Sequence, residues 1–138
     1  MIPAPGTFVD SSVLLDVFTE DPRWLAWSEG QLTAAAQRGV LVINAVVLAE
    51  IAPRFSRVEA LRTSLPSMAI VEPIPPAASF LAGHAHAAHR RAGGRREAIL
   101  PDLLIGAHAA ITGRPLLTRD PQRVAMHIPG VALIHPDD

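Results

Sequence analysis

The chain has 138 residues and a formal net charge of −1, with 49% hydrophobic and 18% charged residues. This length predicts one domain over residues 1–138 with a core of its own, and this composition excludes a disordered chain. The sequence contains no cysteine, which excludes disulfides, cysteine-ligated zinc and cysteine nucleophiles. With so little net charge, any binding of nucleic acid must depend on local clusters of basic residues.

We expect a cytoplasmic protein that does not enter a membrane. The N-terminus lacks the basic start and long apolar run of a signal peptide. No apolar run approaches the roughly 20 residues that span a bilayer. The lack of cysteine also fits a reducing compartment.

The first half of the chain predicts two strands, each followed by a pair of helices. The expected strands cover residues 7–10 and 40–43, and the expected helices cover 13–18, 22–38, 45–51 and 57–65. Ser11 or Ser12 can cap the first helix and Asn44 the third. Gly39 is expected to end the second helix in a left-handed conformation.

The second half predicts three more strands and continues the alternation with helices. The strands are expected at 68–71, 115–118 and 131–134, and the helices at 75–92 and 101–113, with a short one before the last strand. This order predicts an α/β fold with a mostly parallel, five-stranded sheet and helices on both faces. Ligands of such sheets bind beyond the carboxyl ends of the strands, where Asp10 and Asp120 are expected.

Two further carboxylates stand on apolar helices. Glu50 shares a helix face with two valines, and Asp102 lies in the first turn of an apolar helix, where the helix dipole favours its charge. Carboxylates gathered at one sheet edge repel each other, and a divalent cation relieves this repulsion. Oxygen-only ligands suit Mg²⁺ or Mn²⁺, and such a site predicts hydrolysis of a phosphodiester. Thr118 could orient a carboxylate or a water by hydrogen bonding.

Each acid also has a simpler interpretation. Asp10 could cap the first helix, Asp102 could only face the helix dipole, Glu50 could pair with an arginine, and Asp120 could be a turn residue before a proline. The joint placement of all four in a doubly wound α/β pattern favours a shared metal site.

Four segments of the chain resemble the motifs of PIN domains, and among these the chain looks most similar to VapC toxins. The segments are FVDSSVLL at 8–15, NAVVLAE at 44–50, LPDLLIGAHA at 100–109 and LLTRD at 116–120, followed by IPGV at 128–131, which is also seen in VapC chains. They cover nearly the whole chain in order and are specific as a set. Residues 54–68 carry no motif of this family.

The resemblance implies an Mg²⁺- or Mn²⁺-dependent endoribonuclease, the toxin of a toxin–antitoxin pair. It implies Asp10 and Asp102 as the surest metal ligands, with Asp120 and Glu50 completing the site and Thr118 and Ser11 supporting it. It further implies a homodimer and inhibition by a VapB-type antitoxin, which we expect to insert a basic side chain at the acidic edge.

Other functions fit the sequence less well. Haloacid-dehalogenase-like phosphatases, receiver domains and Walker-type nucleotide sites all need a lysine, and all 12 basic residues here are arginines. Two alternatives stay open: a PIN nuclease of RNA processing outside any toxin–antitoxin pair, and a non-catalytic module that binds RNA or protein.

Several basic and aromatic residues have two interpretations. Arg90, Arg91, Arg95 and Arg96 flank Gly93-Gly94 and either face a helix end or form a mobile lip that holds RNA phosphates. Trp24 and Trp27 are expected to be packing anchors or dimer contacts rather than platforms for bases.

The histidines are expected to be structural. His84, His86 and His89 do not share one helix face, which favours surface or half-buried histidines over zinc ligands. His108 is expected to be a hydrogen-bonded core residue rather than a general base.

Overall fold

The computed structural model describes residues 3–94 and 99–137. Its strands form one five-stranded sheet in the order β3-β2-β1-β4-β5, and every neighbouring pair is parallel. The strands are β1 (Thr7–Val9), β2 (Leu41–Ile43), β3 (Ile70–Val71), β4 (Leu116–Leu117) and β5 (Leu133–Ile134). The predicted α/β class with a parallel five-stranded sheet is therefore confirmed.

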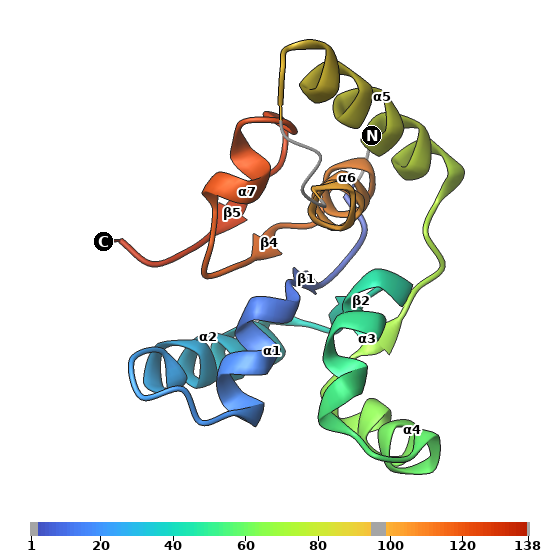
Figure 1. Cartoon of the computed structure of the whole chain (residues 1–138). Coiled ribbons are helices and arrows are strands. Elements are labelled where there is room, and N and C mark those ends of the chain that lie inside the picture. The colour runs from blue at the N-terminus through green and yellow to red at the C-terminus, as the bar shows by residue number, and fades with distance from the viewer. Residues whose placement is uncertain (1–2, 95–98, 138) are drawn as a thin grey trace.

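Helices cover both sides of this sheet. They are α1 (Ser11–Phe18), α2 (Leu25–Arg38), α3 (Ala45–Ile51), α4 (Val58–Met68), α5 (Pro76–Arg91), α6 (Leu100–Thr112) and α7 (Gln122–Ala125), with a 3-10 turn, η1 (Ala52–Arg54), between α3 and α4. Figure 1 shows α5 and α6 on one side of the strands and α1 and α2 on the other. Within the described residues, no helix has both the length and the apolar character needed to cross a bilayer.

The central strands are buried because their side chains are apolar on both faces. Phe8 of β1 pairs with Val42 of β2 and Leu116 of β4, and all three side chains lie in the core. Leu103 of α6 packs there as well. Full burial of one such side chain stabilises the fold by about 1.5–3 kcal/mol, so the middle of the sheet is its firmest part.

Three boundaries differ from the prediction for local reasons. The second helix begins at Leu25 instead of residue 22, and residues 22–24 form a turn in which the Asp21 carboxylate accepts hydrogen bonds from the backbone N–H groups of Arg23 and Trp24. The expected strand at 68–71 is only Ile70–Val71, since α4 continues through Met68. Both residues of this edge strand are exposed, so the sheet is less buried there than expected.

Two predicted helix ends are also wrong in detail. Gly39 follows α2 as expected, but its φ of 165° is extended and not left-handed. The first helix begins at Ser11, and Asp10 takes the cap position that was expected for Ser11 or Ser12. Asn44 does cap α3, because its Oδ1 accepts from the N–H groups of Val46 and Val47.

Helix α7 lies against α6 because position 106 has no side chain. A Cβ on Gly106 would come within 2.4 Å of Val124 Cγ1, a distance that real contacts do not reach. The close approach holds α7, which carries Arg123, beside the helix that begins near Asp102.

Candidate functional site

Hydroxyl groups hold Asp10 at the carboxyl end of β1. Its side chain is only 8% exposed, and Oδ2 accepts hydrogen bonds from Ser12 Oγ at 2.7 Å and Thr118 Oγ1 at 2.8 Å. Although Asp10 occupies the cap position of α1, its side chain makes no capping hydrogen bond. Asp10 is thus the N-cap residue of α1 by position, but capping does not account for its side-chain contacts.

Thr118 and Arg123 bring Asp120 and Asp102 to the same place. Thr118 Oγ1 accepts a hydrogen bond from the backbone N–H of Asp120 while it donates to Asp10. The guanidinium of Arg123 lies 3.9 Å from Asp102 Oδ1 and 3.6 Å from Asp120 Oδ2. One cation thus stands within ion-pair distance of both carboxylates.

Glu50 joins the same edge from α3. Ser11 Oγ donates a hydrogen bond of 2.8 Å to Glu50 Oε1, which ties the last turn of α3 to the residue next to Asp10. Across residues 3–94 and 99–137, the carboxylate of Glu50 pairs with this hydroxyl and with no arginine. The structure therefore brings Glu50 to the start of α1, as a shared site requires.

The electrostatics of Asp102 show that the four acids form one cluster. Burial raises the pKa of Asp102 to about 6, against the pull of Arg123, which lowers it. The charges of Asp10, Glu50 and Asp120 raise this pKa further. Each of the other three carboxylates is thus close enough to disfavour a negative charge on Asp102.

The carboxylates of this cluster are chemically suited to a divalent cation, but their side chains are not arranged to hold one in this structure. As the side chains stand, no group of three or more His, Cys, Asp or Glu in the described part of the chain could hold a metal ion. The donors are carboxylate oxygens only, which suits Mg²⁺ or Mn²⁺ and not softer metals. Burial, and to a smaller extent the charges of Asp10, Glu50 and Asp120, raise the pKa of Asp102, and a bound cation would offset both effects, so the chemistry of these residues fits the ion.

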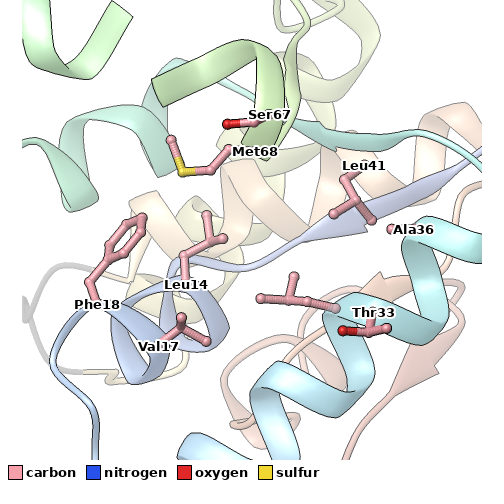
Figure 2. A pocket seen from close by; sticks show the side chains of 9 residues that line it. Leu14, Val17, Phe18, Thr33, Ala36, Leu41, Ser67 and Met68 are labelled. Atoms are coloured by element: carbon pink, nitrogen blue, oxygen red, sulfur yellow. The ribbon is translucent and has the colours of Figure 1, made fainter. Parts of the chain in front are cut away.

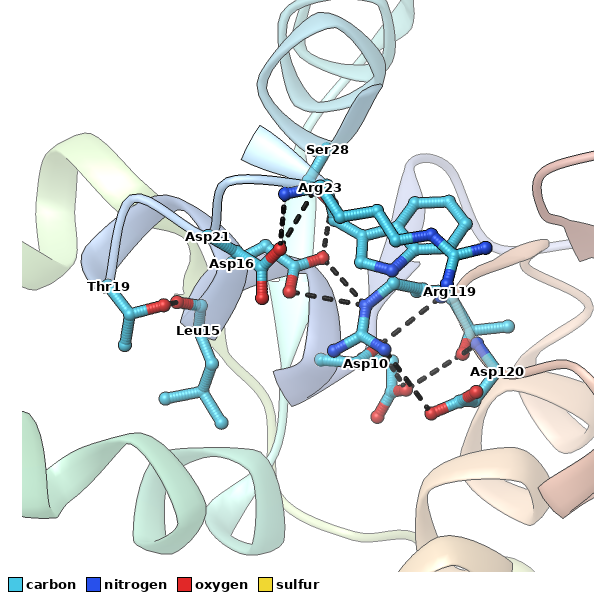
Figure 3. Close-up of polar contacts among 12 residues, drawn as sticks. Asp10, Leu15, Asp16, Thr19, Asp21, Arg23, Ser28, Arg119 and Asp120 are labelled. Atoms are coloured by element: carbon cyan, nitrogen blue, oxygen red, sulfur yellow. Dashed lines mark hydrogen bonds and ion pairs between the residues drawn. The ribbon is translucent and has the colours of Figure 1, made fainter. Parts of the chain in front are cut away.

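Two residues beside the cluster were not foreseen from the sequence. Asp16 of α1 is 2% exposed and accepts hydrogen bonds from Ser28 Oγ at 2.7 Å and from Arg119 Nε at 2.9 Å. Arg119 in turn places its NH1 group 3.8 Å from Asp120 Oδ2 (Figure 3). A signal was present, because a carboxylate among the apolar residues of a short helix is costly without a partner.

The guanidinium of Arg119 also stacks against an aromatic ring. Its Cζ lies 5.6 Å from the centroid of Trp24, and the Cζ of Arg23 lies 5.1 Å from the same ring. Trp27 packs against the core, which confirms its expected role as a packing anchor. Trp24 is half-buried at the surface, in edge-to-face contact with Trp27.

His108 is the core residue that was predicted. Its ring is fully buried, with Nδ1 3.1 Å from Asn44 Nδ2 and Nε2 2.7 Å from Glu72 Oε1. Because Asn44 Oδ1 already accepts from the backbone of α3, Nδ2 donates to Nδ1, and the His108 proton is on Nε2. Arg114 donates to both oxygens of Glu72, and these hydrogen bonds hold the pKa of Glu72 below its usual range.

The remaining basic candidates stand apart from these contacts. His84 is exposed and His86 and His89 are half-buried, as expected for structural histidines. Arg90 and Arg91 are exposed in the last turn of α5. Arg95 and Arg96 lie outside the described residues, so the arginine lip stays a prediction.

An apolar groove opens between α1, α2 and α4, away from the carboxylates. The groove has a volume of about 250 Å³ and is lined by Leu14, Val17, Phe18, Leu32, Thr33, Ala36, Leu41, Ser67 and Met68. Figure 2 shows these side chains. None of the lining side chains is ionisable. The segment 54–68, which carried no recognisable motif, supplies one wall of this groove.

The fold is that of chains found in toxin–antitoxin complexes. A chain of VapBC2 from Rickettsia felis, bound to a DNA fragment from its promoter, is 19% identical with a TM-score of 0.70, covering 95% of this chain and 98% of that chain. A chain of VapBC-1 from nontypeable Haemophilus influenzae is 18% identical with a TM-score of 0.67, covering 94% and 96%. A chain of VapBC-5 from Mycobacterium tuberculosis is 18% identical with a TM-score of 0.55, covering 98% and 100%. At such identities the likeness establishes the fold alone.

Sequence comparison gives the family directly. No curated protein matches the chain. The PIN domain, as a family, matches residues 7–125, which include all four carboxylates of the cluster. The chain therefore belongs to the PIN-domain family.

Proposed function

We propose that this protein is a metal-dependent endoribonuclease and the toxin of a VapBC-type toxin–antitoxin pair. Membership of the PIN-domain family supports a nuclease, and the likeness to chains of VapBC complexes supports a toxin of this type. The observation that carries the proposal is the convergence of Asp10, Glu50, Asp102 and Asp120 at one edge of the parallel sheet.

These four carboxylates are the residues that would hold Mg²⁺ or Mn²⁺. When bound, the ion supplies polarisation of the scissile phosphate, activation of a water and stabilisation of the leaving oxygen. The chain's own hydroxyl groups prepare the ligands. Ser12 and Thr118 fix one oxygen of Asp10, and Ser11 orients Glu50.

The proposal includes partners and a location. A single-stranded or structured RNA is the substrate, a second copy of the chain completes a homodimer, and the site of action is the cytoplasm. A VapB-type antitoxin inhibits the enzyme by inserting an arginine among the carboxylates. The apolar groove along α1, α2 and α4 offers such a partner an apolar surface to pack against.

Metal-dependent cleavage by the purified protein tests the enzymatic part. We expect RNA cleavage with Mn²⁺ or Mg²⁺ that EDTA abolishes, and losses of orders of magnitude for Asp10→Asn and Asp102→Asn. Glu29→Gln, which changes an exposed acid of α2, should cleave like the wild type. Cleavage that survives EDTA, or full activity of both site variants, would overturn the assignment.

Co-expression with the neighbouring small open reading frame tests the partner. We expect a stable complex in which cleavage is suppressed, and Met68→Glu should weaken that complex by placing a charge in the apolar groove. A nuclease of RNA processing would cleave without such a partner. A non-catalytic module would bind RNA and leave it intact.

A further inference from the structure

Arg119 is fixed more firmly than an ordinary surface arginine. Its Nε donates to both oxygens of the buried Asp16, at 2.9 and 3.2 Å, and Ser28 Oγ holds the same carboxylate from α2. The ring of Trp24 stacks against the guanidinium. The backbone N–H of Arg119 donates to Ser12 Oγ, a group that also bonds to Asp10.

Only the Nε side of the Arg119 guanidinium takes part in this anchoring. Nε takes the hydrogen bonds to Asp16, whereas in the described part of the chain NH1 and NH2 make no hydrogen bond within 3.5 Å. NH1 stands 3.8 Å from Asp120 Oδ2, and the side chain is 26% exposed. A rigid fork of N–H donors therefore opens to solvent at the rim of the carboxylate cluster.

A second cation extends this rim. The guanidinium of Arg23 lies over the ring of Trp24 that also supports Arg119. No described carboxylate lies within 4.0 Å of the Arg23 guanidinium, whereas Arg119 has its charge balanced by Asp16. Two guanidinium groups thus flank the carboxylate cluster, with Asp16, Asp21 and Asp120 as the acids that act on Arg119.

We propose that Arg119 binds a backbone phosphate of the RNA next to the carboxylate cluster, and that Asp16 is the positioning residue that orients its guanidinium. The inference rests on the proposed function, because the phosphate belongs to the substrate of the same site. Arginine suits this role because its planar fork donates two parallel hydrogen bonds to phosphate oxygens. The competing interpretation is an ion pair that only stabilises the fold.

Measuring RNA affinity as a function of salt concentration distinguishes the phosphate-binding role of Arg119 from an ion pair that only stabilises the fold. The probe is a fluorescent single-stranded RNA oligonucleotide, and every protein carries Asp10→Asn to prevent cleavage. We expect Arg119→Gln to weaken binding roughly tenfold or more, as for the removal of hydrogen bonds to a charged group. The log–log salt slope should fall by roughly 0.7, because the variant binds one phosphate fewer. Arg62→Gln, an exposed arginine of α4, is the matched control and should leave both quantities unchanged.

Two further variants guard against a purely structural effect. Arg119→Lys keeps the charge, but one ammonium cannot reach Asp16 and also offer a fork to phosphate. Compared with Arg119→Gln, Arg119→Lys should recover part of the thermal stability but little of the RNA affinity. In an Asp16→Asn background, Arg119→Gln should cost less affinity than it does alone, because the guanidinium has already lost its orientation.

The outcomes also distinguish this inference from the proposed function. If the wild type cleaves RNA and Arg119→Gln lowers stability while affinity and salt slope stay unchanged, the phosphate-binding role is wrong and the nuclease stands. If Arg119→Lys binds RNA like the wild type, or the double variant is strictly additive, the oriented fork is wrong. A wild type that neither binds nor cuts RNA overturns both proposals together.

Discussion

At the scale of single residues, Asp102 carries a charge that the metal-free fold disfavours. Its pKa is raised to about 6, chiefly by burial, against 3.8 for an unperturbed aspartate. A raised pKa means that this group's favourable contribution is complete below about pH 4 and is lost as the pH rises through about 6. The cost of ionisation is therefore fully present at neutral pH.

Asp102→Asn should accordingly stabilise the metal-free protein at pH 7.5. We expect a gain of up to about 2 kcal/mol in the free energy of unfolding, reduced by the missing attraction to Arg123. Urea denaturation in EDTA at several pH values between 4 and 8 measures this. The difference between variant and wild type should grow from pH 4 to pH 6 and then level off. A difference that is independent of pH would contradict the raised pKa of Asp102.

Arg123 is the residue whose charge most directly competes with a metal ion. Its guanidinium lies within 4.0 Å of both Asp102 and Asp120. Arg123→Gln should raise the affinity for Mn²⁺ roughly threefold to tenfold, because two partly exposed ion pairs are each worth no more than about 1 kcal/mol.

Calorimetric titration of Mn²⁺ at pH 7.5, with Arg62→Gln as control, measures this change. The gain should shrink toward pH 6, since the removal of Arg123 raises the pKa of Asp102 and protons then compete with the metal. Equal or weaker Mn²⁺ binding by the variant would show that Arg123 does not oppose the ion.

At the scale of elements, the packing of α6 against α7 depends on a missing side chain. A Cβ at position 106 would overlap Val124, whereas one at Gly83, in the middle of α5, would meet nothing within 4 Å. Alanine at an open helical site gains about 1 kcal/mol over glycine, but an overpacked site costs about 1–3 kcal/mol. Gly83→Ala should therefore stabilise the fold and Gly106→Ala should not.

The same pair of variants reports on the site. If α7 moves when Gly106 gains a methyl group, Arg123 moves with it and Mn²⁺ affinity changes, whereas Gly83→Ala should leave it unchanged. Thermal unfolding together with Mn²⁺ titration tests both points. Equal stabilisation by the two alanines would mean that α6 and α7 do not pack as described.

At this scale, the sequence could predict those elements that are marked by a pattern of hydrophobic residues. Buried runs such as those around Phe8 and Leu116 identified the strands, and their parallel order placed Asp10 and Asp120 at one edge. Periodicity does not contain side-chain interactions near the boundaries, such as the hydrogen bond that the Trp24 backbone N–H donates to Asp21. The Asp16–Arg119 pair joins residues that are 103 positions apart, so this pairing can be recognised only in the folded structure.

At the scale of the whole molecule, the net charge of −1 does not show that acidic and basic side chains gather in particular places. The carboxylates gather at the sheet edge, and arginines stand around them. Arg90 and Arg91 end α5, which packs against α6, the helix whose first turn holds Asp102. The position of the lip beside the acids stays an expectation from the sequence.

The arginine lip can be tested from this arrangement. Arg90→Ala with Arg91→Ala, and separately Arg95→Ala with Arg96→Ala, should weaken RNA binding across sequences, because arginines that bind phosphates carry no sequence information. The salt slope should flatten by roughly 0.7 for every phosphate of a single strand that the variant no longer binds.

Stability should stay nearly unchanged for the pair Arg90 and Arg91, since exposed charges contribute little to folding. This separates these arginines from Arg119, whose removal leaves the buried Asp16 without its cation and should lower stability as well as affinity. The measurement is RNA affinity from low to high salt in the Asp10→Asn background, with thermal unfolding of each variant. If both pairs bind RNA with unchanged affinity and slope, these four arginines do not contact the substrate, and the prediction of an arginine lip is wrong.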